Sequence, residues 1–306
     1  MTQHWSLRTR FVLFALACLV PLLVVVVFFL NNSVERNTEE LINSETTLAN
    51  LVNQSLTNYL NANYEAMQVI ASHPAVVQME DPDTINATLG QARTFRPEVS
   101  GIFLVDSDGR VLGESGIDTA EVLPAIPSLL ETTVSTGQRG VSHRIDLNDD
   151  TSVIVLTVPV TTVTQTELTT TAAKTPAAAQ ETQPEAPIPT PATTSTKPAG
   201  TTLGVVGTVI QIDNLNKAVI PILRARTEIA VVSESQVIAS SGDILRNEAR
   251  FLERFGDEME QVQDRTTGTF RTTDLNGVAR LGVYAPVQLD AADWSVIITN
   301  PTPNSY

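Results

Sequence analysis

The chain has 306 residues and a formal net charge of −15, with 34 acidic side chains against 19 basic ones. This acidic balance argues against nucleic acid as a partner, because phosphate binding requires a basic face. One cysteine and three histidines supply neither a disulfide framework nor a structural zinc site, so we expect no metal and no other cofactor.

The first predicted element is a transmembrane helix over 11–30, where twenty consecutive residues are uncharged and largely apolar. Such a helix spans about 30 Å, the hydrocarbon thickness of a bilayer. A cleaved signal peptide is the alternative, but its apolar region is about 7–15 residues long and is followed by a small-residue cleavage site. Arg8 and Arg10 precede the segment, and three glutamates follow it within ten residues. The positive-inside rule therefore predicts a cytoplasmic N-terminus (1–10) and a single-pass anchor in the cell membrane, with the bulk of the chain extracytoplasmic.

A long extracytoplasmic helix is predicted over 31–80. Between 33 and 72 the sequence has no glycine or proline, and apolar residues from Leu41 to Ile70 recur at helical spacing. The stripe has a period close to 3.5, so the helix could be a stalk that forms a homodimer with the same helix of a second copy. For its C-terminal half, lying on a sheet of its own domain explains the stripe equally well, and both arrangements can hold along different stretches.

The next elements alternate between short helices and strands. A helix is predicted from a cap at Asp83 or Thr84 to about Phe95, and a second from Leu215 to Arg224. Period-two patterns separated by Asp, Asn and Gly turns predict strands over 101–106, 110–112, 139–146, 151–160 and 203–213.

A low-complexity tract lies between the last two of these strands. Residues 161–202 consist mainly of threonine, proline and alanine and contain almost no large apolar side chains. Such a segment cannot bury enough surface to offset its ordering entropy, so we predict that it is disordered.

An internal repeat indicates what this tract is. Ile102, Leu104 and Val105 match Ile229, Val231 and Val232 at an offset of 127, and Pro159-Val160 matches Pro286-Val287 at the same offset. Val205-Val206, however, matches Val296-Ile297 at an offset of only 91. The two copies agree if the tract is an insertion at a hairpin tip inside the first copy, which loop-closure entropy tolerates.

The predicted fold class is α+β, with two tandem modules after the long helix. The first module covers 81–223, including the insertion at 161–202, and the second covers 224–301. A short tail, 302–306, follows.

In this order the elements resemble the double Cache sensor domains of bacterial transmembrane receptors, which are extracytoplasmic relatives of PAS domains. The resemblance covers 33–301. It rests on the signal anchor with its long helix, the strand-turn-strand at 101–115, Thr157 to Val160, Leu203 to Gly207 followed by Ile212-Asp213, Tyr284 to Val287, and Trp294 to Ile298. It implies PAS-like modules with antiparallel sheets.

The resemblance also implies a function, the sensing of a small-molecule ligand by the input part of a receptor. Such receptors continue into a second membrane helix and a histidine kinase, diguanylate cyclase or chemoreceptor output. Because this chain ends at Tyr306, we expect the output part to be missing from it. Amino-acid-sensing members carry an aromatic and arginine motif that residues 113–138 lack, so that ligand class is not predicted.

The candidate ligand-binding residues are Arg139, His143, Arg144 and Asp146, on or beside one predicted strand. In PAS-like folds the central sheet faces a pocket, where arginine with polar neighbours can hold an anionic or zwitterionic ligand. The alternative is that these side chains lie on a solvent-facing side of the sheet. Strict alternation places Arg139 and His143 on one face and Arg144 and Asp146 on the other, so an unbroken strand cannot point all four into one pocket.

No catalytic or metal-binding residues are predicted. The acidic clusters beginning at Asp106 and Asp146 do not match a full calcium loop, and Asp, Asn and Gly are what hairpin turns require. Ser142-His143 lacks a third triad partner, and the nucleophile-elbow, Walker A and H-E-x-x-H patterns are absent. We therefore expect no enzyme. The alternative to a sensor is a membrane-anchored surface interaction or spacer protein without a small ligand.

Overall fold

The computed structural model describes residues 7–147, 151–162, 201–220, 227–233, 236–241, 248–254, 266–273, 277–289 and 293–302. Several predictions lie outside these residues: the turn at 148–150, the disorder of nearly all of 161–202, the end of the helix predicted to reach Arg224, and most of the tail 302–306.

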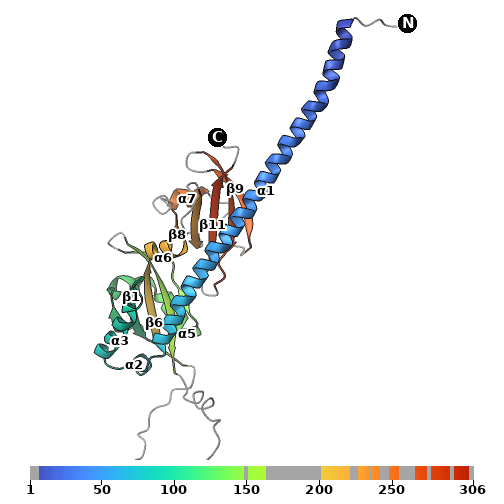
Figure 1. Ribbon diagram of the computed structural model, residues 1–306. Helices are drawn as coiled ribbons and strands as arrows, with labels where there is room; N and C mark the ends of the chain where they lie inside the picture. Colours follow the sequence, from blue (N-terminus) through green and yellow to red (C-terminus); the bar gives the residue numbers. More distant parts are fainter. Residues whose placement is uncertain are drawn as a thin grey trace, which may run out of the picture. The chain divides into compact units, whose positions relative to one another are not determined.

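The chain is α+β and divides into two compact units. Ser55–Val219 with Leu289–Ala292 form one unit, and Met1–Gln54, Ile220–Gln288 and Asp293–Tyr306 form the other. We call the former the first module and the latter the second module. Each contains one antiparallel sheet (Figure 1).

Helix α1 (Leu7–Ala71) is continuous over 65 residues. Its buried apolar side chains recur every three or four residues: Ala49, Val52, Leu56, Leu60, Tyr64, Met67 and Ala71. This stripe shows that α1 packs on its own chain along this length, as one of the two readings of the pattern predicted. Leu51, which the pattern assigned to the stripe, is instead half exposed.

Within the residues that the structure describes, no helix is both long and apolar enough to cross a membrane. The predicted span over 11–30, which is part of α1, is therefore not confirmed.

Two short helices follow α1, and side chains cap both. His73 Nδ1 accepts the Ala75 N–H at 3.3 Å at the start of α2 (Pro74–Val77). Asp81 caps α3 (Pro82–Thr94), because its Oδ1 accepts the N–H groups of Asp83 and Thr84, each at 3.1 Å. The cap predicted at Asp83 or Thr84 is wrong, since Pro82 takes the first helical position and moves the helix start toward the N-terminus.

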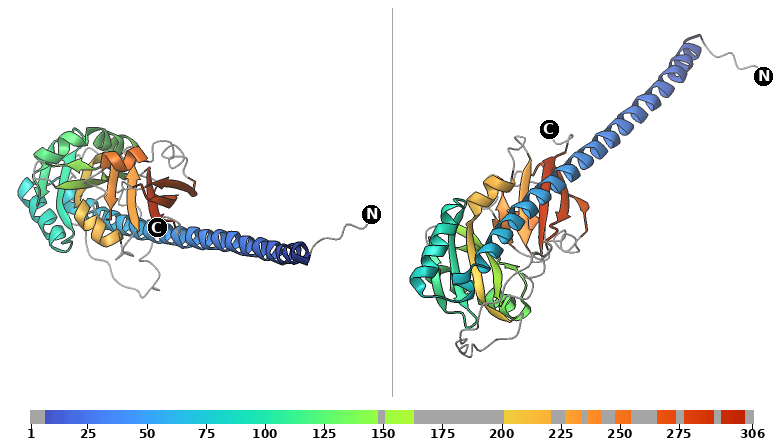
Figure 2. Two further views of the ribbon diagram at one scale, coloured as in Figure 1. Left: turned by 90° about the horizontal axis from the view of Figure 1, so that it is seen from above. Right: turned by 60° about the horizontal axis from the view of Figure 1, so that its bottom comes forward.

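The sheet of the first module has the strand order β2-β1-β6-β5-β3, and β4 pairs with β5 beside β3. Its strands are β1 (Val99–Asp106), β2 (Val111–Ser115), β3 (Gly140–Val141), β4 (Ile145–Asp146), β5 (Ser152–Thr161) and β6 (Thr202–Gln211). Its further helices are α4 (Thr119–Val122), η1 (Leu123–Ala125), α5 (Pro127–Thr136) and α6 (Ile212–Val219). Helix α3 packs on β1 and β2, and α5 on β5 and β6 (Figure 2).

The single strand predicted over 139–146 is wrong, because the chain leaves the ladder between β3 and β4. The Ser142 hydroxyl accepts the Val155 N–H at 2.8 Å, and the Ser142 N–H donates to the Val155 carbonyl at 2.8 Å. The side chain thus replaces a backbone carbonyl in the pairing with β5. The strict alternation of faces expected for Arg139 to Asp146 does not hold.

Strands β5 and β6 form the hairpin that brackets the low-complexity tract. They pair from Val153↔Gln211 to Thr161↔Thr202, one residue before the described parts end at 162 and 201. Residues 163–200 therefore connect two adjacent antiparallel strands of one sheet.

The sheet of the second module has the order β8-β7-β11-β10-β9. Its strands are β7 (Glu228–Ser233), β8 (Gln236–Ser240), β9 (Gly268–Thr273), β10 (Ala279–Pro286) and β11 (Trp294–Pro301), and its helix is α7 (Glu248–Arg254). This order repeats that of the first sheet, with β7, β10 and β11 in the places of β1, β5 and β6, as the internal repeat predicts.

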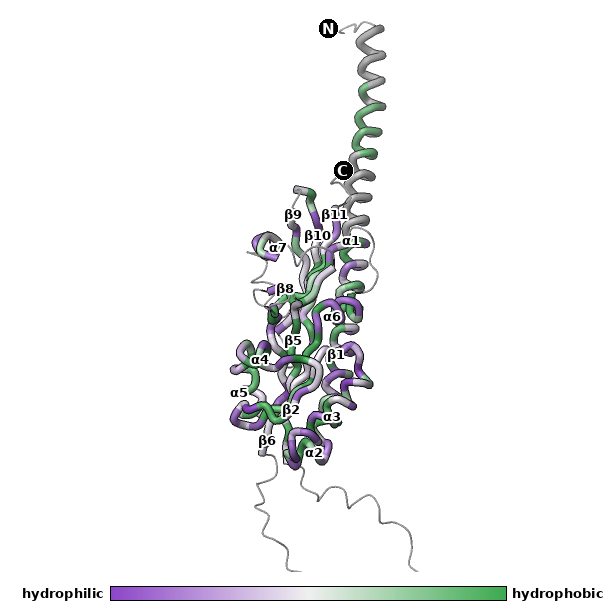
Figure 3. Tube along the Cα trace, turned by 90° about the vertical axis from the view of Figure 1, so that its left-hand side faces the viewer, coloured by the Kyte–Doolittle hydropathy of each residue, from purple (hydrophilic) through white to green (hydrophobic). Residues whose placement is uncertain are grey.

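Each module has its own apolar core. In the first, Phe103, Val155 and Val209 of the sheet pack with Ile126 and Leu130 of the covering segment. Apolar residues run along most of β5 (green in Figure 3), and both of its faces are buried. In the second, Phe251 of α7 packs with Phe270 and Tyr284 of the sheet.

Candidate ligand-binding site

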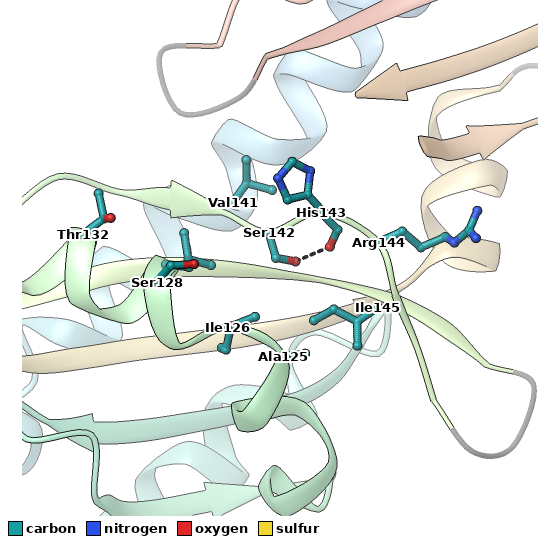
Figure 4. A pocket seen from close by; sticks show the side chains of 10 residues that line it. Ala125, Ile126, Ser128, Thr132, Val141, Ser142, His143, Arg144 and Ile145 are labelled. Carbon is teal, nitrogen blue, oxygen red and sulfur yellow. Dashed lines mark hydrogen bonds between the residues drawn. The ribbon is translucent and has the colours of Figure 1, made fainter. Parts of the chain in front are cut away.

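A hollow of about 300 Å³ lies in the first module, between the η1–α5 segment and residues 141–145. Figure 4 shows it from close by. Its lining combines aliphatic, hydroxyl-bearing and basic residues: Ala125, Ile126, Leu129, Val141 and Ile145; Ser128, Thr132 and Ser142; His143 and Arg144.

Helix α5 supplies one wall, and its ends are encoded in the sequence. Pro127 takes its first turn, and Gly137 closes it at φ +66° with its N–H on the Thr133 carbonyl. Leu130 and Thr133 face the core, and the Thr133 hydroxyl lies 2.8 Å from that of Thr157 on β5. Ser128, Leu129 and Thr132 are thereby left along the rim of the hollow.

Residues 141–145 supply the opposite wall. An extended strand would send alternate side chains to opposite faces, but the departure from the ladder at Ser142 brings five consecutive residues to one hollow. The Ser142 hydroxyl also donates to the His143 carbonyl at 2.6 Å, which fixes the backbone at this point.

Of the four residues singled out from the sequence, His143 and Arg144 line the hollow. Asp146 is bound to Arg144 by two hydrogen bonds, Nε to Oδ1 at 3.0 Å and Nη2 to Oδ2 at 3.1 Å. The Ser152 hydroxyl donates to the same carboxylate at 2.6 Å. Partial burial raises the pKa of Asp146, but the Ser152 hydroxyl and the Arg144 guanidinium outweigh it and hold the pKa below its usual value.

The pairing with Asp146 directs the Arg144 side chain toward β4. The Arg144 side chain is 12% exposed and that of Asp146 is 62% exposed. In Figure 4 the Arg144 guanidinium points away from Ser128 and Thr132 across the hollow. The charge of Arg144 is thus compensated by Asp146 in the structure.

Arg139, the fourth predicted residue, contacts α1 and is not part of the lining. Its Nη1 donates to Asn61 Oδ1 at 3.1 Å, and its guanidinium carbon lies 4.9 Å from the ring centroid of Tyr64. The Tyr64 hydroxyl donates to the Gly140 carbonyl at 2.8 Å. Burial raises the pKa of Tyr64 well above its usual value, and Arg139 opposes this only in part.

Sequence reasoning missed Ser128, Thr132 and Ser142. The α5 residues could have been found from Pro127 and Gly137, which mark a helix start and a helix end ten residues apart. Nothing local distinguishes Ser142 from an ordinary strand residue. Within the described part of the chain, no group of three or more His, Cys, Asp or Glu side chains is placed to hold a metal ion.

The comparisons with known proteins agree with this architecture. A family model described as the Cache domain matches residues 30–306. A search of curated protein sequences finds no match.

Solved structures of bacterial chemoreceptor domains share the fold. The ligand-binding domain of Pseudomonas aeruginosa PAO1 PctB, in complex with L-Arg, has a TM-score of 0.59 at 15% identity and covers 88% of this chain and 98% of its own. The sensory domain of Campylobacter jejuni Tlp3 with isoleucine bound gives 0.57 at 14% identity, covering 86% and 94%. The Pseudomonas fluorescens CtaA domain with L-leucine gives 0.56 at 13% identity, covering 87% and 97%.

Proposed function

Because the chain belongs to the Cache domain family, we propose that it is the extracytoplasmic input part of a signal-transduction receptor and binds a small molecule in its first module. The observation that carries this proposal is the hollow between α5 and residues 141–145, with aliphatic and hydroxyl groups side by side. Pockets for small ligands combine apolar walls with a few placed polar groups in this way.

The residues of the hollow and the ligands of the structural relatives indicate which compounds to test first. The chemoreceptor domains with the same fold bind L-Arg, isoleucine or L-leucine, which makes amino acids the first compounds to test. Ser128 and Thr132 supply hydroxyl donors and acceptors here, and Ile126 and Leu129 supply apolar surface. We propose that His143 and Arg144 contact the ligand, Arg144 through the part of its side chain that lines the hollow, while Asp146 fixes the orientation of the Arg144 guanidinium.

We also propose that residues 11–30 anchor the chain in the cell membrane, with 1–10 in the cytoplasm. The sequence supports this, and so do the large apolar side chains of α1 between Leu16 and Val26 whose exposure is described, each at least 47% exposed. Apolar surface of this extent is unfavourable in water and favourable in lipid. Leu51 and Val69, also exposed on α1, support a homodimer through this helix.

A ligand screen on the full chain in detergent tests the sensor proposal. Amino acids, organic acids and amines are added singly, and the melting temperature is measured. At least one compound should raise it, because a ligand that binds only the folded state stabilises it by mass action. Thr132→Arg, which places a large charged side chain at the hollow, should abolish the rise, whereas Ser135→Arg, one turn further along the same helix and outside the lining, should not. A rise that survives Thr132→Arg, or no rise with any compound, contradicts the proposal.

Deleting 163–200 separates the sensor from an interaction or spacer protein. Since β5 and β6 pair up to Thr161 and Thr202, a short turn can replace the tract without disturbing the sheet. Ligand binding should survive this deletion. If instead the deletion removes a surface contact and no small molecule binds, the interaction protein is the better description.

A further inference from the structure

The start of β3 joins two parts of the first module within a few residues. Arg139 and Gly140 are bound to α1, while Val141 to Ile145 form a wall of the hollow. Neighbouring Cα atoms are 3.8 Å apart across a trans peptide. Gly140 and Val141 are also the two residues of β3, so a displacement of this strand from the hollow side moves both.

Three contacts attach this point to α1. The buried Tyr64 hydroxyl donates to the Gly140 carbonyl at 2.8 Å. The Arg139 guanidinium carbon lies 4.9 Å from the centroid of the Tyr64 ring, within the range of a cation–π interaction. The Arg139 Nη1 donates to Asn61 Oδ1 at 3.1 Å, one helical turn before Tyr64.

These contacts differ in how easily they can be given up. Tyr64 is 2% exposed, so its hydroxyl has no water to replace the Gly140 carbonyl if the strand moves away. Arg139 is exposed, and its guanidinium can follow either partner. Movement of β3 must therefore displace Tyr64 with it or break a buried hydrogen bond.

We propose that Tyr64 and Arg139 are positioning residues that transmit occupancy of the hollow to α1. A molecule in the hollow displaces residues 141–145, Gly140 moves with them, and the Tyr64 hydroxyl shifts the segment of α1 around residues 58–66. This proposal rests on the proposed function for its physiological use, but its test needs no natural ligand.

The hollow can be filled covalently. In a Cys18→Ser background, which removes the only cysteine, Thr132→Cys is modified with butyl methanethiosulfonate, so that a butylthio group occupies the hollow. Hydrogen–deuterium exchange of the full chain in detergent is then compared with and without the label. Ser135→Cys with the same label is the matched control, because Ser135 is exposed like Thr132 but does not line the hollow.

Filling the hollow should change the exchange rate of residues 58–66 by about threefold, the order expected when one buried hydrogen bond is perturbed. Tyr64→Phe keeps the ring and its packing but should abolish the change. Arg139→Gln should reduce it, and Arg139→Lys, which keeps a cation over the ring, should restore part of it. The melting temperatures of the unlabelled variants show that each is folded. If Tyr64→Phe does not fold, the variants of the exposed Arg139 still test the proposal.

A label on Thr132→Cys that leaves the exchange of 58–66 unchanged overturns the proposal, as does an unaltered response in both Tyr64→Phe and Arg139→Gln. The same response from labelled Ser135→Cys also overturns it. Transmission from the label without any binding compound in the screen supports the coupling and counts against the sensor. If a compound binds but the label leaves the exchange of 58–66 unchanged, the sensor is supported and the coupling through Tyr64 and Arg139 is contradicted.

Discussion

In the first module, helix α5 covers β5 and β6 and leaves a hollow beside its hydroxyl-bearing rim. In the second module, a sheet with the same strand order packs with Phe251 of α7 in a core cluster that contains Phe270 and Tyr284 beside aliphatic residues. The same strand order is therefore combined with different covering side chains in the two modules. Among the described residues, helix α5 presents Ser128 and Thr132 to the hollow of the first module, whereas helix α7 contributes Phe251 to the core of the second.

Both sheets nevertheless use one packing device. Phe103 lies over Gly207 in the first module, where an added Cβ would lie 2.0 Å from the ring, and Phe270 lies over Gly282 in the second, where it would lie 2.2 Å away. Each glycine faces an aromatic ring on the neighbouring strand, Gly207 pairing with Phe103 and Gly282 with Phe270. The glycines make room for the rings.

The largest expected effect tests whether the phenylalanine–glycine contact stabilises the two modules equally. Phe103→Ala should lower the free energy of unfolding of the first module by about 3–5 kcal/mol, because it empties a fully buried site. Phe270→Ala should act comparably on the second module. Denaturant unfolding of the full chain measures both, and Phe95→Ala, at a 75% exposed position, is the control. A loss below about 1 kcal/mol in either module breaks the equivalence.

A smaller effect on stability is expected from the ion pair of the second module, Arg280 with Glu228, which is more buried than the Arg144–Asp146 pair of the first. Arg280 in the second module has a 6% exposed side chain and lies 3.4 Å from Glu228, with a further hydrogen bond from its Nε to the Thr299 hydroxyl at 3.1 Å. Arg280→Met should cost about 2 kcal/mol, because it removes the buried guanidinium that pairs with the partly buried Glu228. Chemical denaturation checks this, and Arg280→Lys should recover part of the loss. If Arg280→Met loses no stability, the ion pair of the second module contributes no more than that of the first.

In the first module, a buried hydrogen bond between Thr133 and Thr157 connects α5 to the sheet. Thr157→Val keeps the shape but removes one partner of the buried Thr133–Thr157 hydrogen bond. The expected cost is about 1 kcal/mol. A double-mutant cycle with Thr133→Val measures the coupling of the two hydroxyls, and additive costs would show that they do not interact.

The smallest effect concerns the ion pair at the hollow and depends on pH. The folded-state pKa of Asp146 is lowered, so its stabilising contribution is present above the unfolded-state pKa and disappears as the pH falls through the lower folded value. Since its side chain is 62% exposed, Asp146→Asn should cost below about 1 kcal/mol at pH 7. Unfolding measured between about pH 7 and pH 2 should show wild type and variant converging at the acidic end. A constant difference throughout would contradict the assigned cause.

Much of the fold could be predicted because its signals are local. The strands β1, β5 and β6 are Val- and Ile-rich runs between turn residues, and the internal repeat located the tract at 161–202 relative to them. The α4–η1–α5 segment was missed, because its elements are short and proline interrupts them. The break at Ser142 was missed because its cause is the N–H of Val155 on another strand.

In the candidate site, too, only the contacts between residues close in sequence could be predicted. Arg144 and Asp146 are two residues apart, so a pairing between them needs only local geometry. The partners of Arg139, by contrast, lie 75 residues or more away on α1. An arginine beside polar residues therefore pointed to a ligand, while the fold assigns that guanidinium to an aromatic ring.

The pairing of Thr161 with Thr202 has a practical consequence. The two strand ends are held about 5 Å apart by the sheet itself, whatever connects them. The position already accepts 38 residues, 163–200, between its described ends. A circularly permuted fluorescent protein, whose own termini are adjacent, would fit this junction, and β5, which carries the partner of Ser142, would connect such a reporter directly to the wall of the hollow.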